Sequence, residues 1–248
     1  QRQMCIRDRL YIENWFPFSY EFDSTGNFAI ADITGYAIYI CSNKKQNTKI
    51  SNVQNLSVVY NSICFDSFDN MIVSDIGNNN IYIYDKNSNY TSVSTISGIY
   101  GYAIYINKIN NNLVVADKNN DNVYIFQRQS TFPFYNTTSM TTLNFPGLLP
   151  RSVCYDLKNN LLIGVNGHLY VYDSTSYTLI QDLLIDDIYP YSISIDKNNN
   201  AAVCGRNGIY IFNLNSYTRT FRYYNQLGST GINISTTSCD FDYYGNFC

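Results

Sequence analysis

The chain has 248 residues, of which 45% are hydrophobic, and a formal net charge of −3 at pH 7. This length can bury a sizeable core, and the 25 Tyr and 14 Phe residues favour β-strands. The acidic balance excludes long-range attraction to phosphate backbones, so nucleic acid is not an expected partner. No continuous apolar stretch reaches the ~18 to 20 residues of a membrane span, so no membrane partner is expected either.

The first nine residues, QRQMCIRDR, resemble translated sequencing-adapter read-through. We therefore expect residues 1–9 to be foreign to the native protein and exclude them from the fold. Residues 10–248 are expected to form one domain, with the native start and end lying outside the sequence given. Within it, LYIENWF at 10–16 is expected to be the last strand of a preceding or closing repeat.

From residue 18 onward one block recurs about every 40 to 50 residues. It consists of a short apolar run, an anchor Asp or Asn, a tight Asn-rich turn and a second apolar run. The copies begin FSYEFDSTGN (18), NSICFDSFDN (61), YAIYINKINN (102), RSVCYDLKNN (151), YSISIDKNNN (191) and TSCDFDYYGN (237). Their anchors are Asp23, Asp66, Asn107, Asp156, Asp196 and Asp242.

Each block predicts a strand, a tight hairpin and a second strand, because apolar residues alternate with a period of two. The anchor side chain is expected to accept hydrogen bonds from the turn amides. An Ile-Tyr run then predicts a third strand at 36–40, 80–85, 122–126, 168–173 and 208–212. A fourth, less regular strand is expected near Tyr90, Tyr177 and Tyr217.

Four antiparallel strands in each repeat predict an all-β protein, a β-propeller with five complete blades and part of a sixth. The ring is expected to be incomplete, because the sixth block breaks off at Cys248. A β-sandwich or barrel is the alternative, but it would not explain why the same four-stranded block returns.

The repeat resembles the NHL-type propeller family in two motifs. One is VVADKNN at 114–120 followed by VYIF at 123–126, and the other is IVSDIGN at 72–78 followed by IYIY at 81–84. The sequence departs from the family where Ala37, Asn80 and Asn122 replace an Arg before the third strand, and where Val165 and Gly205 replace the Asp that ends strand two. The resemblance implies a propeller but no single function, because family members range from RNA- and protein-binding modules to lyases and lactonases.

Two groups of side chains are expected on the face formed by the loops between strands two and three and between blades. Blades one to three would present Asp32, Asp75 and Asp117 there, and blades four and five would present Arg151, His168 and Arg206. This charge asymmetry predicts a polarised mouth that orients a peptide or small ligand. The alternative is that the Asp residues cap their turns and the basic residues are solvated.

The longest insertion, between the third strand of blade three and Asp156, contains Phe132, Phe134 and Tyr135. Long loops on a rigid scaffold often carry function, and exposed aromatic residues could bind a partner. The alternative is that these rings pack against the edge of the blade.

Neither a cofactor nor a catalytic set is predicted. Glu21 and Asp240 each precede an anchor by two residues, so in a six-bladed ring they could approach each other and hold a divalent metal. The 7 Cys residues include no pair with zinc-finger spacing and are expected to be buried free thiols. Such thiols favour a reducing compartment such as the cytoplasm.

The sequence therefore predicts a non-catalytic, NHL-like interaction scaffold that binds a protein or peptide and acts as a monomer. The alternative is a metal-dependent propeller hydrolase or lyase, similar to lactonases, with its site in the central channel.

Overall fold

The computed structural model describes residues 17–32, 37–41, 60–91, 93–186, 188–206 and 208–224. The described strands form five antiparallel sheets, each made of strands that follow one another in the chain. The first sheet contains three described strands: β1 (Pro17–Phe22), β2 (Phe28–Asp32) and β3 (Ala37–Cys41). The second contains β4 (Tyr60–Phe65), β5 (Met71–Asp75), β6 (Asn80–Tyr84) and β7 (Val93–Ser97).

The other three sheets also have four strands each. The third contains β8 (Gly101–Ile106), β9 (Leu113–Asp117), β10 (Asn122–Phe126) and β11 (Thr141–Asn144). The fourth contains β12 (Ser152–Tyr155), β13 (Leu161–Val165), β14 (His168–Tyr172) and β15 (Leu179–Leu184). The fifth contains β16 (Tyr189–Ile195), β17 (Asn200–Arg206), β18 (Gly208–Asn213) and β19 (Thr218–Tyr224). A 3₁₀ turn, Lys86–Ser88, precedes β7.

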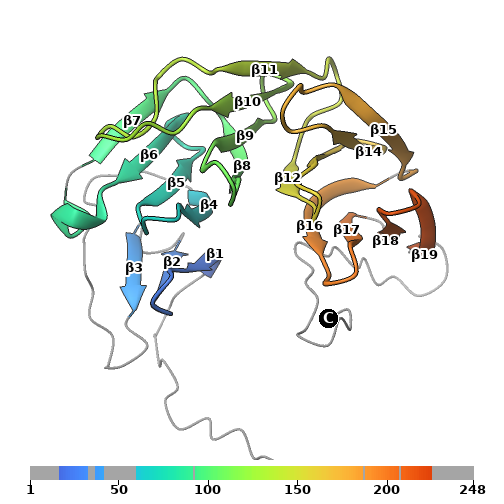
Figure 1. Cartoon of the computed structure of the whole chain (residues 1–248), viewed down its shortest axis with the longest axis horizontal. Coiled ribbons are helices and arrows are strands. Elements are labelled where there is room, and N and C mark those ends of the chain that lie inside the picture. Colours follow the sequence, from blue (N-terminus) through green and yellow to red (C-terminus); the bar gives the residue numbers. More distant parts are fainter. Residues whose placement is uncertain are drawn as a thin grey trace, which may run out of the picture.

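The five sheets are the blades of a β-propeller, as the repeat predicts. The first strands β1, β4, β8, β12 and β16 pack against one another in that order and line the centre, while the fourth strands lie outside (Figure 1). Within the described residues the arc is open between the fifth blade and the first (Figure 1). The sixth block, with its anchor at Asp242, and the adapter-like residues 1–9 lie outside the described residues.

The anchor residues hold the first hairpin of each blade, as predicted. In the fifth blade, Oδ1 of Asp196 accepts hydrogen bonds from the amides of Asn198 (2.8 Å) and Asn200 (2.7 Å). Its Oδ2 accepts from Nδ2 of Asn200 at 2.8 Å. The same three bonds recur around the anchors Asp23, Asp66 and Asp156. The turn is thus determined by residues at most four positions apart.

The same turns also connect neighbouring blades. In each of three cases, the amide after one anchor donates to a side chain of the next blade's turn. The pairs are Ser24 to Oδ1 of Asp69 (2.7 Å), Ser67 to Oδ1 of Asn111 (2.9 Å) and Leu157 to Oδ1 of Asn199 (2.9 Å). All three acceptor residues have a positive φ, which Asn and Asp tolerate better than most residues. The repeat therefore specifies blade-to-blade contacts as well as hairpins.

The core consists of the apolar layers between adjacent blades. Strands β5, β9 and β13 are buried along their whole length, since each is covered on both faces by neighbouring blades. As predicted, Cys64, Cys154 and Cys204 are buried, and none of these three forms a disulfide. Among the described residues there is no helix long and apolar enough to cross a membrane.

Candidate functional site

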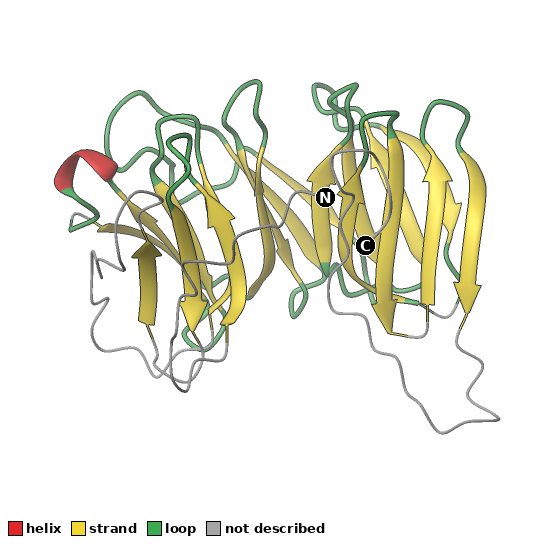
Figure 2. Ribbon diagram, turned by 90° about the horizontal axis from the view of Figure 1, so that it is seen from below, coloured by secondary structure: helices red, strands yellow, loops and turns green. Residues whose placement is uncertain are grey.

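Loops gather at the two ends of the strands, so the propeller has two faces (Figure 2). We call the side with the anchor turns, such as 66–70 and 156–160, the anchor face. The opposite side, which we call the crossover face, carries the second hairpin of each blade, such as 117–122 and 165–168, and the connections between blades. The predicted mouth residues lie at strand ends on the crossover face.

Arg151, which directly precedes β12, lies at the centre of a cation–aromatic cluster on the crossover face. Its side chain is largely buried, with the residue 8% exposed, and its Nε donates to Oδ1 of Asn166 at 3.1 Å. Its Cζ lies 5.8 Å, 5.1 Å and 5.5 Å from the ring centres of Tyr102, Tyr189 and Tyr191, respectively. These rings come from the inner strands β8 and β16, so three consecutive blades build the cluster.

A second cation joins this cluster. Nζ of Lys118, in the β9–β10 turn, lies 5.1 Å from the ring centre of Tyr102. Burial, together with the nearby charge of Arg151, lowers the pKa of Lys118. No carboxylate of the described residues forms an ion pair with either cation. We call Arg151, Lys118, Tyr102, Tyr189 and Tyr191 the cationic cluster; it repels further cations and attracts an anion.

The other two predicted basic residues lie at different distances from this cluster. Arg206 ends β17, is exposed, and pairs in register with Tyr189, so it stands beside the cationic cluster. His168 begins β14, the third strand of its blade, where its ring stacks on Tyr170 with centroids 5.3 Å apart. Its Nδ1 lies 2.8 Å from Oδ1 of Asp182. His168 is thus engaged within the outer half of its blade.

The predicted acidic half of the mouth is built differently from its basic half. Asp75 and Asp117 end β5 and β9 and are fully buried. Each accepts hydrogen bonds within its own turn: Asp75 from Asn78 at 3.0 Å, and Asp117 from Nδ2 of Asn120 at 2.7 Å. They act as turn caps, the alternative considered from the sequence. Asp32 ends β2 at the equivalent place, and its side chain lies outside the described part of the chain.

The first half of the long insertion, which carries Phe132, Phe134 and Tyr135, lies on the anchor face. The second half is not a loop: Thr141–Asn144 form β11, the fourth strand of the third blade, because they complete the sheet on β10. Phe134 and Tyr135 are buried, at 7% and 1% exposed, whereas Phe132 remains 43% exposed. The hydroxyl of Tyr135 donates to the carbonyl of Asn111 at 3.0 Å. Packing against the blade therefore explains two of the three aromatic residues.

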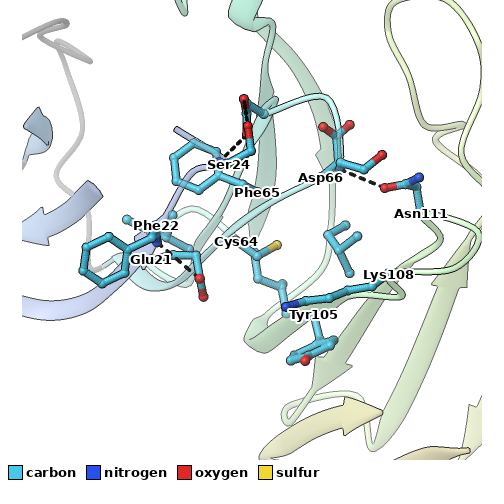
Figure 3. A pocket seen from close by; sticks show the side chains of 14 residues that line it. Glu21, Phe22, Ser24, Cys64, Phe65, Asp66, Tyr105, Lys108 and Asn111 are labelled. Atoms are coloured by element: carbon cyan, nitrogen blue, oxygen red, sulfur yellow. Dashed lines mark hydrogen bonds between the residues drawn. The ribbon is translucent and has the colours of Figure 1, made fainter. Parts of the chain in front are cut away.

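A pocket of about 270 Å³ opens between the inner strands β1, β4 and β8, where Glu21, Cys64 and Lys108 contribute to its lining (Figure 3). Burial raises the pKa of the Cys64 thiol, and the carboxylates of Glu21 and Asp66 raise it further. A thiol whose pKa is raised is a poor nucleophile, so we do not expect Cys64 to react in the folded protein. Asp240, the predicted metal partner of Glu21, lies outside the described residues. Among those described, no group of three or more His, Cys, Asp or Glu side chains is arranged to hold a metal ion.

Sequence reasoning identified Arg151 and Arg206 but missed Lys118 and the three tyrosines. Tyr102 and Tyr191 open the apolar run of their blocks, each five positions before an anchor, where the sequence pattern predicts only a strand. A signal was present: Arg151 occupies the same position of its block. Three neighbouring blades therefore place the equivalent residues of their blocks side by side at the mouth.

The five sheets around a common centre define the chain as a β-propeller. It is similar to virginiamycin B lyase from Staphylococcus aureus: the selenomethionine-substituted structure has a TM-score of 0.72 at 12% identity, over 90% of this chain and 73% of that chain. A catalytically inactive histidine-to-alanine variant with quinupristin has a TM-score of 0.75 at 13% identity, over 94% and 77% of the two chains. The Dos1 propeller has a TM-score of 0.63 at 13% identity, covering 93% of this chain and 65% of that chain.

No protein-family model and no curated protein sequence matches the chain. Similarity at such low identity shows the propeller fold alone, because one fold carries many functions.

Proposed function

We propose that the chain is a non-catalytic, NHL-like β-propeller that binds a protein or peptide partner on its crossover face. One observation carries the proposal: the cationic cluster combines two neighbouring cations with three tyrosine rings and no carboxylate ion pair among the described residues. Aromatic residues and Arg are the residue types enriched where proteins bind one another. The ligand group that this chemistry favours is an anion, either a carboxylate or a phosphate on the partner.

The electrostatics support an anionic ligand group. Arg151 and Lys118 carry like charges whose repulsion contributes to the lowered pKa of Lys118. The tyrosine rings offset part of this cost through cation–π contacts, each worth about 0.5 to 2 kcal/mol. An anion bound between the two cations would be attracted by both, and these two attractions would offset the repulsion. Exposed Arg206, paired in register with Tyr189, would add a third cation at the rim.

A peptide array tests the proposal, with every acidic peptide matched to its amide counterpart and to a phosphorylated version. We expect Arg151→Gln to weaken binding of the acidic or phosphorylated members about tenfold or more, since a charge-assisted, two-bond contact is lost. Lys158→Gln is the matched control, because Lys158 is an exposed lysine in an anchor turn on the opposite face. Equal binding of the charged and amide members, or unchanged binding by folded Arg151→Gln, would refute the proposal. Whether the acidic or the phosphorylated peptides bind more tightly shows whether the ligand group is a carboxylate or a phosphate.

A second candidate is a metal-dependent hydrolase or lyase, favoured by the structural similarity to virginiamycin B lyase. Its site would be the pocket at the inner strands, where Glu21 supplies a carboxylate. Metal content should be measured on the full chain together with turnover of quinupristin and a panel of lactones and esters. A stoichiometric metal with turnover that is lost in Glu21→Gln would replace the binding proposal with this one.

A further inference from the structure

A second pocket lies on the anchor face, opposite the cationic cluster. It has a volume of about 460 Å³ and lies between the turns of the second and third blades. Phe68 and Asn110 line it from the anchor turns, and Arg128, Gln129 and Phe134 line it from the loop after β10. Its residues are separate from those of the cationic cluster, so it is an independent site.

Arg128 is the central charged group of this pocket. Its side chain is 10% exposed, and its Nε donates to Oδ2 of the buried anchor Asp66 at 3.2 Å. Its Cζ lies 4.8 Å and 4.5 Å from the ring centres of Phe68 and Phe134. Among the described residues, its two terminal nitrogens donate no hydrogen bond, although Arg128 lines the pocket. Four N–H groups of a planar guanidinium are therefore available to a ligand.

The anchor turn does not need this arginine. The turns at Asp23, Asp156 and Asp196 make the same three hydrogen bonds, and in the described structure none of these carboxylates forms an ion pair. The turn at Asp66 makes these bonds as well and has Arg128 in addition. Neutralising an anchor is thus not a general requirement of the fold, and Arg128 is open to another role.

The loop that carries Arg128 is held in one conformation by its own contacts. Arg128 pairs with Tyr135 in an isolated β-bridge, and the amide of Gln129 donates to the carbonyl of Phe134 at 2.7 Å. The hydroxyl of Tyr135, a residue that is 1% exposed, donates to the carbonyl of Asn111 in the anchor turn of the same blade. The guanidinium is therefore positioned before any ligand arrives, which lowers the entropy lost on binding.

Exposed apolar side chains surround this charged centre. Phe68 is 62% exposed, and Ile109, beside the lining residue Asn110, is 74% exposed. Phe132 is 43% exposed and contacts Phe134 edge to face, with ring centres 5.5 Å apart. Large apolar side chains that remain exposed around a polar centre are typical of binding sites.

We propose that this pocket binds a peptide segment with a carboxylate next to a bulky apolar side chain, and that Arg128 binds the carboxylate. The two terminal nitrogens form a planar fork that matches the two carboxylate oxygens. Asp66 occupies the Nε edge and fixes the orientation of the fork. Phe68 and Phe132 provide the apolar contact for the adjacent side chain.

The experiment uses the 248-residue chain and two probes, N-acetyl-phenylalanine and its uncharged amide, N-acetyl-phenylalaninamide. Binding is measured by NMR titration, with the Nε–H signal of Arg128 identified from its loss in Arg128→Lys. We expect saturable binding of the acid that shifts this signal. The amide should bind with an affinity lower by about tenfold or more. Arg128→Lys retains the positive charge beside Asp66 but loses the planar fork. It should therefore lower the affinity for the acid about tenfold.

Two controls separate this site from the cationic cluster and from loss of folding. A saturable shift of the Arg128 signal reports this pocket and not the cationic cluster, and Lys158→Gln, which removes an exposed lysine of another anchor turn, should leave that shift unchanged. The thermal midpoint of Arg128→Lys is measured in parallel. In case that variant does not fold, the Nε–H signal is assigned through the side-chain correlations of Arg128 to its own backbone amide, and its shift in the unmodified chain remains the deciding observation. Equal affinity for acid and amide, or saturation with no shift of that signal, would overturn the proposal.

Discussion

The clearest quantitative prediction concerns the anchor of the fifth blade. Asp196→Ala removes three hydrogen bonds, of 2.7 to 2.8 Å, from a carboxylate that is 5% exposed. Hydrogen bonds to charged groups contribute about 1.5 to 3 kcal/mol each, but the freed donors lie in a turn at the surface, where water can replace part of the loss. We expect the free energy of unfolding to fall by about 3 kcal/mol.

Asp196→Asn is the matched control. It retains Oδ1 for the two backbone amides and loses only the bond from Nδ2 of Asn200, so about 1.5 kcal/mol should be lost. The third blade already uses Asn107 in this place, where it accepts from the amide of Ile109 at 2.8 Å. Urea denaturation followed by circular dichroism gives both values, provided that the m-value is unchanged. A loss below about 0.5 kcal/mol for Asp196→Ala, or equal losses for both variants, would refute this reasoning.

Three further predictions follow from local contacts. Gly205→Ala should lower the thermal midpoint markedly and cost about 2 kcal/mol or more, because an added Cβ would lie 1.8 Å from a backbone oxygen of β16; an unchanged midpoint would contradict this. At pH 8, iodoacetamide should modify Cys64 only after unfolding in urea, since burial raises the pKa of that thiol, and peptide mass spectrometry detects the adduct. Burial tends to raise the pKa of Asp69, but hydrogen bonds from Lys86 and Ser24 outweigh it, so the pKa is lowered overall. The resulting stability should be present above the ordinary pKa of an aspartate and vanish as the pH falls through the lowered value; the difference in urea midpoint between the native chain and Asp69→Asn should therefore disappear in acid.

The propeller could be predicted because its repeating information is local. Four anchors, Asp196 among them, accept hydrogen bonds from the amides two and four residues later, and the strands around them alternate with a period of two. The order of strands in each blade follows from short connections, which make consecutive strands neighbours. The course of the long insertion could not be predicted, because the strand β11 at its end has a weak pattern and forms only by pairing with β10.

The sites were only partly predictable, because their members meet through packing between blades. The sequence alone determined the first three strands of each described blade and the anchor turns, and it placed Arg151 and Arg206 on one face. Tertiary structure decided that Arg151 is buried among rings from β8 and β16, with Lys118 beside it. It also decided that Arg128 reaches back to Asp66, sixty-two positions earlier in the chain. A hairpin bond links residues that are close in sequence, whereas these contacts exist only once separate blades have packed around a common centre.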